Sequence, residues 1–220
     1  MQNQSSSAAR GPHQGQPVLT AGEALASAHA AMILLHGRGA SAEDILQVAA
    51  ELDQSGFAFL APQAAGSAWY PNSFLAPLES NEPELTSALQ VIDSLLGEVS
   101  GAGIPRERTM LLGFSQGACL LLEYVARHTA RYGGVVGLSG GLIGPDGTPR
   151  NYPGSLAGTP VFLGCSDVDP HIPRARVDLT AEVLGGLDGD LTERLYPNMG
   201  HIVNQDEIDF VRNLQSQLLG

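Results

Sequence analysis

Hydrophobic residues along this chain fall into two alternating patterns. Short, continuous apolar runs are typical of strands buried on both faces of a sheet. Apolar residues at every third or fourth position are typical of helices with one buried face. The first pattern predicts strands over residues 30–35, 57–61, 108–112, 134–138, 160–165 and 191–196, with a short edge strand expected over 17–20. The second predicts helices over residues 42–52, 82–99, 116–131, 174–184 and 205–218.

This alternation predicts an α/β fold in which a mostly parallel, doubly wound sheet is flanked by helices. The chain has 220 residues, 43% of them hydrophobic, which suffices for one packed domain. We place that domain at residues 16–220 and expect no separate lid domain. Residues 1–15 are polar and rich in Ser, Gln and Gly, so we expect a disordered tail there.

The formal net charge is −12, and all eleven basic residues are Arg. Such a balance disfavours nucleic acid and anionic membranes as partners. The first residues lack the features of a signal peptide and no apolar run could span a membrane, so we expect a cytoplasmic protein. Cys119 and Cys165 lie in apolar surroundings and are expected in the core, outside any disulfide framework. The sequence leaves open whether the chain forms a homodimer.

The pattern G-x-S-x-G, typical of a nucleophilic serine at a strand–turn–helix junction, occurs twice, around Ser115 and around Ser139. Residues 118–132 contain neither Gly nor Pro, so a helix can follow Ser115. Residues 144–149 contain two of each, which excludes a long helix after Ser139. Ser115 is therefore the predicted nucleophile and Ser139 a residue in the loop after a strand.

A serine nucleophile needs an imidazole base, and three histidines follow Ser115. His128 falls late in the predicted helix, away from the strand ends. His171 and His201 both follow strands, and His201 lies in the turn before the last helix, where the base of such an enzyme is expected. We therefore favour His201 as the base, and the role of His171 stays open.

The carboxylate that orients the base should follow the strand at 160–165, where the chain offers both Asp167 and Asp169. Their spacing does not separate them, because alternate residues of an extended loop point the same way. The spacing of these residues and the nearby histidines matches no metal-binding motif, so no metal is predicted.

Two backbone N–H groups must stabilise the oxyanion of the tetrahedral intermediate. The amide of Gln116, next to the nucleophile, and the amide of Arg38, in the loop after residues 30–35, are the predicted donors. For the Arg38 side chain a surface ion pair is favoured over binding of an anionic substrate group. The loop over residues 63–81 carries Trp69, Tyr70 and Phe74, which we predict to bind substrate, although such aromatic residues could also cover the core.

Four blocks of sequence together resemble the phospholipase/carboxylesterase family, which includes the acyl-protein thioesterases. They are His36-Gly37, the segment 113–117, Asp169-Pro170-His171-Ile172-Pro173 and Met199-Gly200-His201. The resemblance implies an α/β-hydrolase fold, Asp169 as the acid beside Ser115 and His201, and cofactor-free hydrolysis through an acyl-enzyme. The stretches 36–40 and 69–71 look closer to small bacterial esterases of the dienelactone-hydrolase-like kind than to the thioesterases.

The sequence thus predicts a serine hydrolase that cleaves small to medium acyl or aryl carboxylic esters. Alternatives within the same chemistry are a thioesterase or lysophospholipase type and a dienelactone type of hydrolase. A non-catalytic ligand-binding protein on a hydrolase scaffold is the alternative from another class. The expected partner is a small-molecule ester, without a cofactor.

Overall fold

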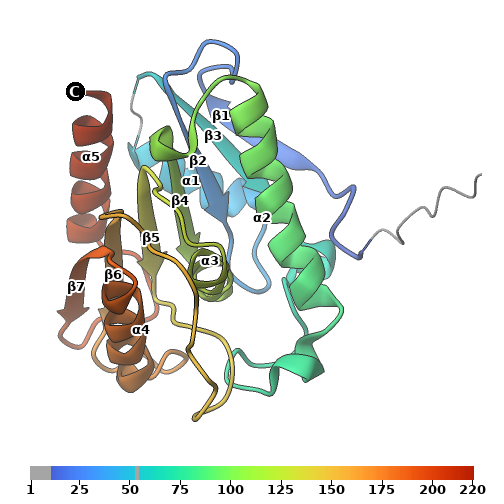
Figure 1. Ribbon diagram of the computed structural model, residues 1–220, viewed down its shortest axis with the longest axis vertical. Helices are drawn as coiled ribbons and strands as arrows, with labels where there is room; N and C mark the ends of the chain where they lie inside the picture. The colour runs from blue at the N-terminus through green and yellow to red at the C-terminus, as the bar shows by residue number, and fades with distance from the viewer. Residues whose placement is uncertain (1–10, 53–54) are drawn as a thin grey trace, which may run out of the picture.

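A seven-stranded sheet forms the centre of the molecule, in the strand order β1-β3-β2-β4-β5-β6-β7 (Figure 1). The computed structural model describes residues 11–52 and 55–220. Strand β1 pairs antiparallel with β3, and the other neighbouring strands run parallel. The strands are β1 Val18–Gly22, β2 Ala30–Leu35, β3 Phe57–Pro62, β4 Thr109–Phe114, β5 Gly134–Leu138, β6 Pro160–Ser166 and β7 Asp190–Tyr196. This is the α/β-hydrolase arrangement that the sequence predicts.

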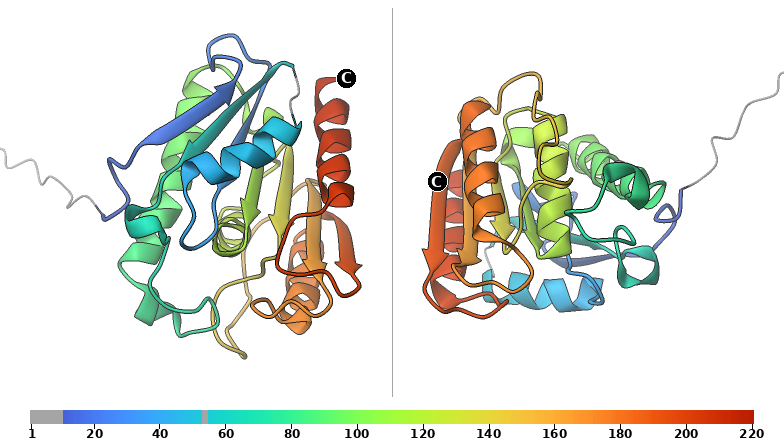
Figure 2. Two further views of the ribbon diagram at one scale, coloured as in Figure 1. Left: turned by 180° about the vertical axis from the view of Figure 1, so that it is seen from behind. Right: turned by 90° about the horizontal axis from the view of Figure 1, so that it is seen from below.

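Helices cover both faces of the sheet (Figure 2). The α-helices are α1 Ala42–Leu52, α2 Glu84–Gly101, α3 Gln116–Arg127, α4 Arg174–Gly186 and α5 Gln205–Leu219. The core is divided accordingly, since successive side chains of a strand point to opposite faces. In β2, Ile33 belongs to the cluster formed with α2, α3 and α4, whereas Met32 belongs to the cluster formed with α1 and α5. Both side chains are almost fully buried.

Local signals in the sequence account for where two of the helices begin. The Ser41 hydroxyl accepts from the Asp44 amide and the Asp44 carboxylate accepts from the Ser41 amide, so the two residues cap α1 reciprocally. Asn204 and Glu207 form the same capping box at the start of α5. These caps satisfy N–H groups that a helix leaves without partners.

Helix α3 is shorter than predicted, because it ends at Arg127 instead of residue 131. The following residues turn back toward the sheet through long-range hydrogen bonds. The Tyr132 amide donates to the Thr159 hydroxyl, and the Gly133 amide donates to the carbonyl oxygens of Arg106 and Thr109. These bonds fix the entry into β5, and a local helical pattern carries no information about them.

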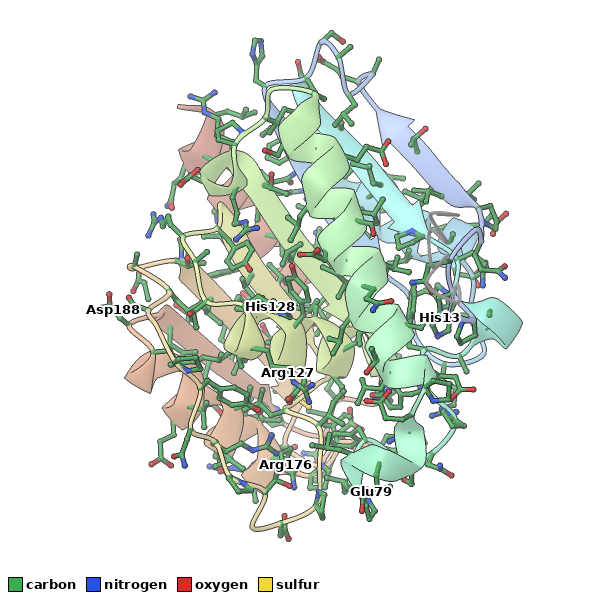
Figure 3. The ribbon with its side chains drawn as sticks, turned by 45° about the vertical axis from the view of Figure 1, so that its right-hand side comes forward. His13, Glu79, Arg127, His128, Arg176 and Asp188 are labelled. Carbon is green, nitrogen blue, oxygen red and sulfur yellow. The ribbon has the colours of Figure 1, made fainter. Side chains whose placement is uncertain are left out.

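The boundary of the predicted N-terminal tail also differs from the structure. Residues 1–10 lie outside the described residues, but residues 11–15 form a turn that packs on the domain. His13 is 2% exposed, and its imidazole Nε2 lies 2.9 Å from the carbonyl oxygen of Trp69. Figure 3 shows His13 against the loop that precedes α2. The tail prediction is therefore wrong for residues 11–15.

The remaining expectations about the chain as a whole concern cysteines and membranes. Cys119 and Cys165 are buried and not disulfide-bonded. Within the described residues, no helix has the length and apolar character that crossing a membrane requires.

Candidate active site

Ser115 occupies the turn between β4 and α3, at the carboxyl end of the parallel strands. Its backbone adopts φ 55° and ψ −119°, a conformation that side-chain-bearing residues rarely take. The flanking glycines permit the turn: a Cβ at Gly113 would lie 2.6 Å from the Ala118 amide nitrogen, and a Cβ at Gly117 would collide with the Leu35 carbonyl. The turn presents the Ser115 hydroxyl at the edge of the sheet.

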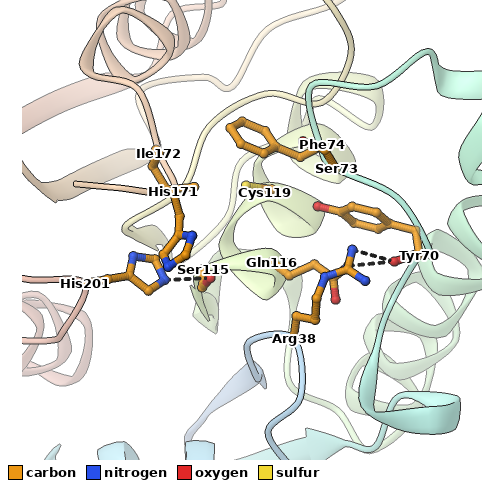
Figure 4. A pocket seen from close by; sticks show the side chains of 10 residues that line it. All are labelled: Arg38, Tyr70, Ser73, Phe74, Ser115, Gln116, Cys119, His171, Ile172 and His201. Atoms are coloured by element: carbon orange, nitrogen blue, oxygen red, sulfur yellow. Dashed lines mark hydrogen bonds between the residues drawn. The ribbon is translucent and has the colours of Figure 1, made fainter.

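Ser115, His201 and Asp169 form one continuous chain of hydrogen bonds (Figure 4 shows the first of its links). The Ser115 hydroxyl lies 2.8 Å from His201 Nε2, and Asp169 Oδ2 lies 2.7 Å from His201 Nδ1. With an acceptor carboxylate at Nδ1, the neutral imidazole carries its proton there and leaves Nε2 free to accept from Ser115. The three residues come from the loops after β4, β6 and β7, which meet because parallel strands end at the same edge.

The Asp169 carboxylate is fully buried, yet it is held in its charged form. Burial favours protonation, but hydrogen bonds from His201 and from the amides of His171 and Ile172 outweigh it and lower the pKa of Asp169. Asp167, the alternative acid, instead accepts from the Asn198 amide at 2.8 Å. It joins the β6 and β7 loops without touching His201.

The other candidates from the sequence lie apart from this hydrogen-bond chain. Ser139 is 1% exposed, and its hydroxyl makes no hydrogen bond to a described residue. His128 follows the last turn of α3, where its ring stacks on Tyr124 at 4.3 Å (Figure 3). His171 is closer, because its ring meets that of His201 edge-on at 4.8 Å.

The two predicted oxyanion donors are the amides of Gln116 and Arg38. Gln116 is the first residue of α3, so its N–H has no acceptor within the helix. The Arg38 amide donates to no other group in the described part of the chain. A Cβ at the neighbouring Gly37 would lie 3.3 Å from Ser115 Cβ, so the loop carrying Arg38 passes close to the serine.

The side chains of these same two residues hold in place the loop over residues 63–81, which is called the aromatic loop below. Gln116 accepts from the Trp69 amide at 2.9 Å and donates to the Tyr70 carbonyl at 2.8 Å. The Arg38 guanidinium donates to the carbonyl oxygens of residues 70–72. The surface ion pair expected for Arg38 is not found among the described residues, where three backbone carbonyls accept from its guanidinium instead.

Only part of the aromatic loop faces the site. Trp69 is fully buried, and its indole N–H donates to the His36 carbonyl at 2.8 Å between the rings of His13 and His36. It covers the core, which was the alternative considered for this loop. Tyr70 and Phe74 do line the cavity next to Ser115.

That cavity has a volume of about 330 Å³, at the small end of the range for ligand sites. Its walls include Arg38, Tyr70, Phe74, Cys119, His171 and His201 (Figure 4). A second, more apolar groove of similar volume lies on the other side of His201, between α1 and the loop after β7. Ile45, Val48, Phe114 and Val203 contribute to it. This groove was not predicted from the sequence, although the apolar pair that follows His201 was a signal for it.

No group of three or more His, Cys, Asp or Glu side chains in residues 11–52 and 55–220 is arranged to hold a metal ion. The described site offers a serine hydroxyl, an imidazole and backbone amides. Together they suit nucleophilic attack on a carbonyl carbon.

Comparison with known proteins agrees with this fold. The family model described as Phospholipase/Carboxylesterase matches residues 21–218. Acyl-protein thioesterase 1 of Gibberella zeae is 34% identical over 127 residues, which cover 54% of this chain and 51% of that protein. Acyl-protein thioesterase 1 of Aspergillus fumigatus is 34% identical over 142 residues, which cover 61% and 58%. The chain thus spans between half and three-fifths of the length of these two curated relatives.

A solved structure agrees over more of the chain. The phospholipase/carboxylesterase from Dyadobacter fermentans superposes with a TM-score of 0.87 at 38% identity, covering 93% of this chain and 97% of that one. The class that the fold and these matches define is the α/β hydrolases. Within it, the chain belongs to the phospholipase/carboxylesterase family.

Proposed function

We propose that this protein is a serine esterase that hydrolyses carboxylic esters with small to medium acyl or aryl groups. The observation that carries the proposal is the unbroken hydrogen-bond chain from Ser115 through His201 to Asp169, next to a cavity of about 330 Å³. A nucleophile, a base and an orienting carboxylate in this arrangement are the requirements of acyl transfer.

In the proposed mechanism, Ser115 Oγ attacks the ester carbonyl carbon while its proton passes to His201 Nε2. The amides of Arg38 and Gln116 stabilise the oxyanion that forms. The bond to the leaving group then breaks, and His201 returns the proton to the departing oxygen. Water, deprotonated by His201, attacks the acyl-enzyme, the Ser115 ester bond breaks, and the acid is released with Ser115 reprotonated.

The two cavities beside His201 suit the two halves of an ester. His201 must reach the departing oxygen, so the leaving group has to lie on the His201 side of the reacting carbonyl. We assign the apolar groove along Ile45 and Val203 to the leaving group, and the cavity lined by Tyr70 and Phe74 to the acyl group.

The test is Ser115→Ala, assayed with p-nitrophenyl esters and with a fluorophosphonate probe that labels activated serines. Both activities should disappear, and Ser139→Ala, the matched control at the second G-x-S-x-G pattern, should keep both. Unchanged labelling of Ser115→Ala would refute the proposal. Wild-type protein that binds esters without turnover or labelling would instead support the non-catalytic binding protein.

A thioesterase activity of the same site is the second candidate, favoured by the acyl-protein thioesterases among the relatives. Oxygen and thiol esters share the acyl-enzyme and differ in the leaving group. Comparison of kcat/KM for an ester, a thioester and a lactone with the same acyl carbon count separates the esterase, thioesterase and dienelactone types.

A further inference from the structure

The cavity beside Ser115 differs in charge from the chain as a whole. The protein carries a net charge of −12, yet no carboxylate is among the described side chains that line this cavity. The permanently charged side chain at its wall is Arg38. A ligand with a negative or electron-rich group would therefore meet an attractive wall here, although the molecule around it is acidic.

The Tyr70 hydroxyl is a buried polar group that lacks an oxygen or nitrogen partner among the described residues. The side chain lines the cavity and is 1% exposed, and the group beside its Oη is the thiol of Cys119. Other buried tyrosines are satisfied: Tyr124 donates to Asp93 at 3.0 Å and Tyr132 donates to the His128 carbonyl at 2.6 Å. Buried hydroxyls are almost always hydrogen-bonded, so the exception in the cavity wall requires a reason.

Figure 4 shows the Tyr70 phenol reaching from the aromatic loop across the cavity toward Cys119. The Cys119 sulfur is only a weak acceptor, and it already accepts from the Gly141 amide. Burial raises the pKa of the Tyr70 phenol well above its ordinary value, and the neighbouring Cys119 adds to this. The phenol therefore keeps its proton and is available as a donor.

Hydrogen bonds fix the backbone of Tyr70 at the cavity wall. Its carbonyl accepts from Gln116 and from Arg38, and the Arg38 guanidinium lies 5.9 Å from the centre of the Tyr70 ring. Three N–H···O contacts hold Arg38 to the loop, and its five-donor guanidinium retains N–H groups at the cavity rim. The Arg38 charge and the Tyr70 hydroxyl donor thus belong to the wall of the same cavity.

We propose that Tyr70 is a specificity-determining residue that donates a hydrogen bond to an acceptor oxygen at the far end of the acyl group. The substrates would be esters of short oxo acids or dicarboxylic acids, with Arg38 favouring the carboxylate. This inference rests on the proposed esterase function and narrows its substrate class. A buried polar side chain that bonds to a substrate group is left without a partner when an analogue lacks that group. Such a site therefore discriminates strongly against the analogue.

The test compares three p-nitrophenyl esters with five-carbon acyl chains: the pentanoate, the 4-oxopentanoate and the monoester of glutaric acid. Each is assayed with wild-type protein and with Tyr70→Phe, which removes only the hydroxyl. The ratio of the two kcat/KM values for each ester cancels differences in intrinsic reactivity. Tyr132→Phe is the matched control, because it removes a buried tyrosine hydroxyl that lies outside the cavity.

We expect Tyr70→Phe to lower kcat/KM for the oxo or glutarate ester about ten-fold or more relative to its effect on the pentanoate. The ester with the greater loss identifies the preferred acceptor. Equal changes for all three esters, or no change, would overturn the inference. These outcomes require turnover by wild-type protein, whereas failure of the esterase proposal would appear as no turnover of any ester.

Binding gives a second readout that does not depend on turnover. In the Ser115→Ala background, Tyr70→Phe should weaken binding of the glutarate monoester more than binding of the pentanoate, as measured by calorimetry. Equal affinity of the glutarate monoester with and without the hydroxyl would mean that Tyr70 does not bond to the acyl group and would overturn the inference.

Discussion

The Gln116 side chain donates a 2.8 Å hydrogen bond to the carbonyl oxygen of Tyr70. It thereby links the residue after Ser115 to the wall of the cavity. Its other amide atom accepts from Trp69, so one buried side chain satisfies two backbone groups of the aromatic loop. The position of the loop and the position of a proposed oxyanion donor are consequently coupled.

Gln116→Ala should loosen both the aromatic loop and the proposed oxyanion donor. Two buried backbone groups would lose their partners, which costs about 1–3 kcal/mol of stability for each unsatisfied group. We expect a lower melting temperature and a higher KM, because the amide of residue 116 remains while the cavity wall loosens. Gln116→Glu keeps an acceptor for the Trp69 amide. Its melting temperature and KM should therefore lie between those of the wild type and of Gln116→Ala. A melting temperature and KM unchanged in Gln116→Ala would contradict the coupling.

Asp169→Asn should lower kcat by about 10³–10⁴-fold, because an amide that donates to His201 Nδ1 selects the tautomer that cannot accept from Ser115. The carboxamide oxygen introduced at this position can still accept from the amides of residues 171 and 172, so the loop should stay folded. Asp167→Asn is the matched control, since Asp167 bonds to Asn198 and not to His201. Steady-state kinetics decide the point: similar losses in the two variants would remove Asp169 from its proposed role.

Glu207 makes the stability depend on pH at the neutral end. Burial raises the pKa of its carboxyl to about 7 from an ordinary 4.5, the Asn204 amide opposes this, and Asp206 adds to it. The folded state therefore binds the proton more tightly than the unfolded chain. Protonation of Glu207 therefore stabilises the folded state. This stabilisation is complete below about pH 4.5 and is lost as the pH rises through about 7.

Glu207→Gln keeps an acceptor for the Asn204 amide and removes the titration. We expect it to raise the free energy of unfolding by up to about 3 kcal/mol at pH values near 8, and by much less near pH 5. Denaturant unfolding at the two pH values measures this difference. A variant that is equally destabilised at both would show that the carboxyl acts only as a cap.

His13 and His36 make the aromatic loop sensitive to acid. One nitrogen of each ring accepts a backbone amide, that of Ala65 for His13 and that of Ala64 for His36. Burial is the main cause that lowers the pKa of both imidazoles from 6.5. The neutral imidazoles stabilise the folded state fully above pH 6.5, the pKa of histidine in the unfolded chain. This stabilisation is lost as the pH falls below that value, because the unfolded chain then binds protons more readily than the folded chain.

Protonation would replace the acceptor of each amide with a second donor. We therefore expect hydrogen exchange at Ala64 and Ala65 to accelerate, relative to intrinsic rates, as the pH is lowered from about 7 to about 5. Histidine side chains ordinarily titrate within this range. Amides of β4, which contact neither imidazole, serve as the control. Equal protection of Ala64 and Ala65 at both pH values would contradict the prediction.

The order of strands and helices could be predicted because each element carries its own local pattern. The positions of Ser115 and His201 were predictable for the same reason, since parallel strands bring the loops that follow them to one edge. Asp169 was less accessible: the spacing left two carboxylates, and only the resemblance to the family chose between them. The structure separates them by partner, His201 for Asp169 and Asn198 for Asp167.

The direction of the aromatic side chains could not be predicted. Trp69 and Tyr70 are neighbours, yet one covers the core and the other faces the cavity. Trp69 donates to the His36 carbonyl and to the Gln116 side chain, both distant in sequence, and these bonds hold its ring over the core. The end of α3 was misplaced for a similar reason, because Thr159 and Arg106 determine where the chain turns.

The turn at residues 11–15 has a practical consequence for work with this protein. His13 supports Trp69 from behind and accepts from Ala65, so the segment acts as a wedge between the aromatic loop and α2. Shortening the expressed chain to begin at residue 16 would remove that wedge and leave an indole with one face uncovered. An N-terminal fusion joined at or before residue 10 would leave it intact.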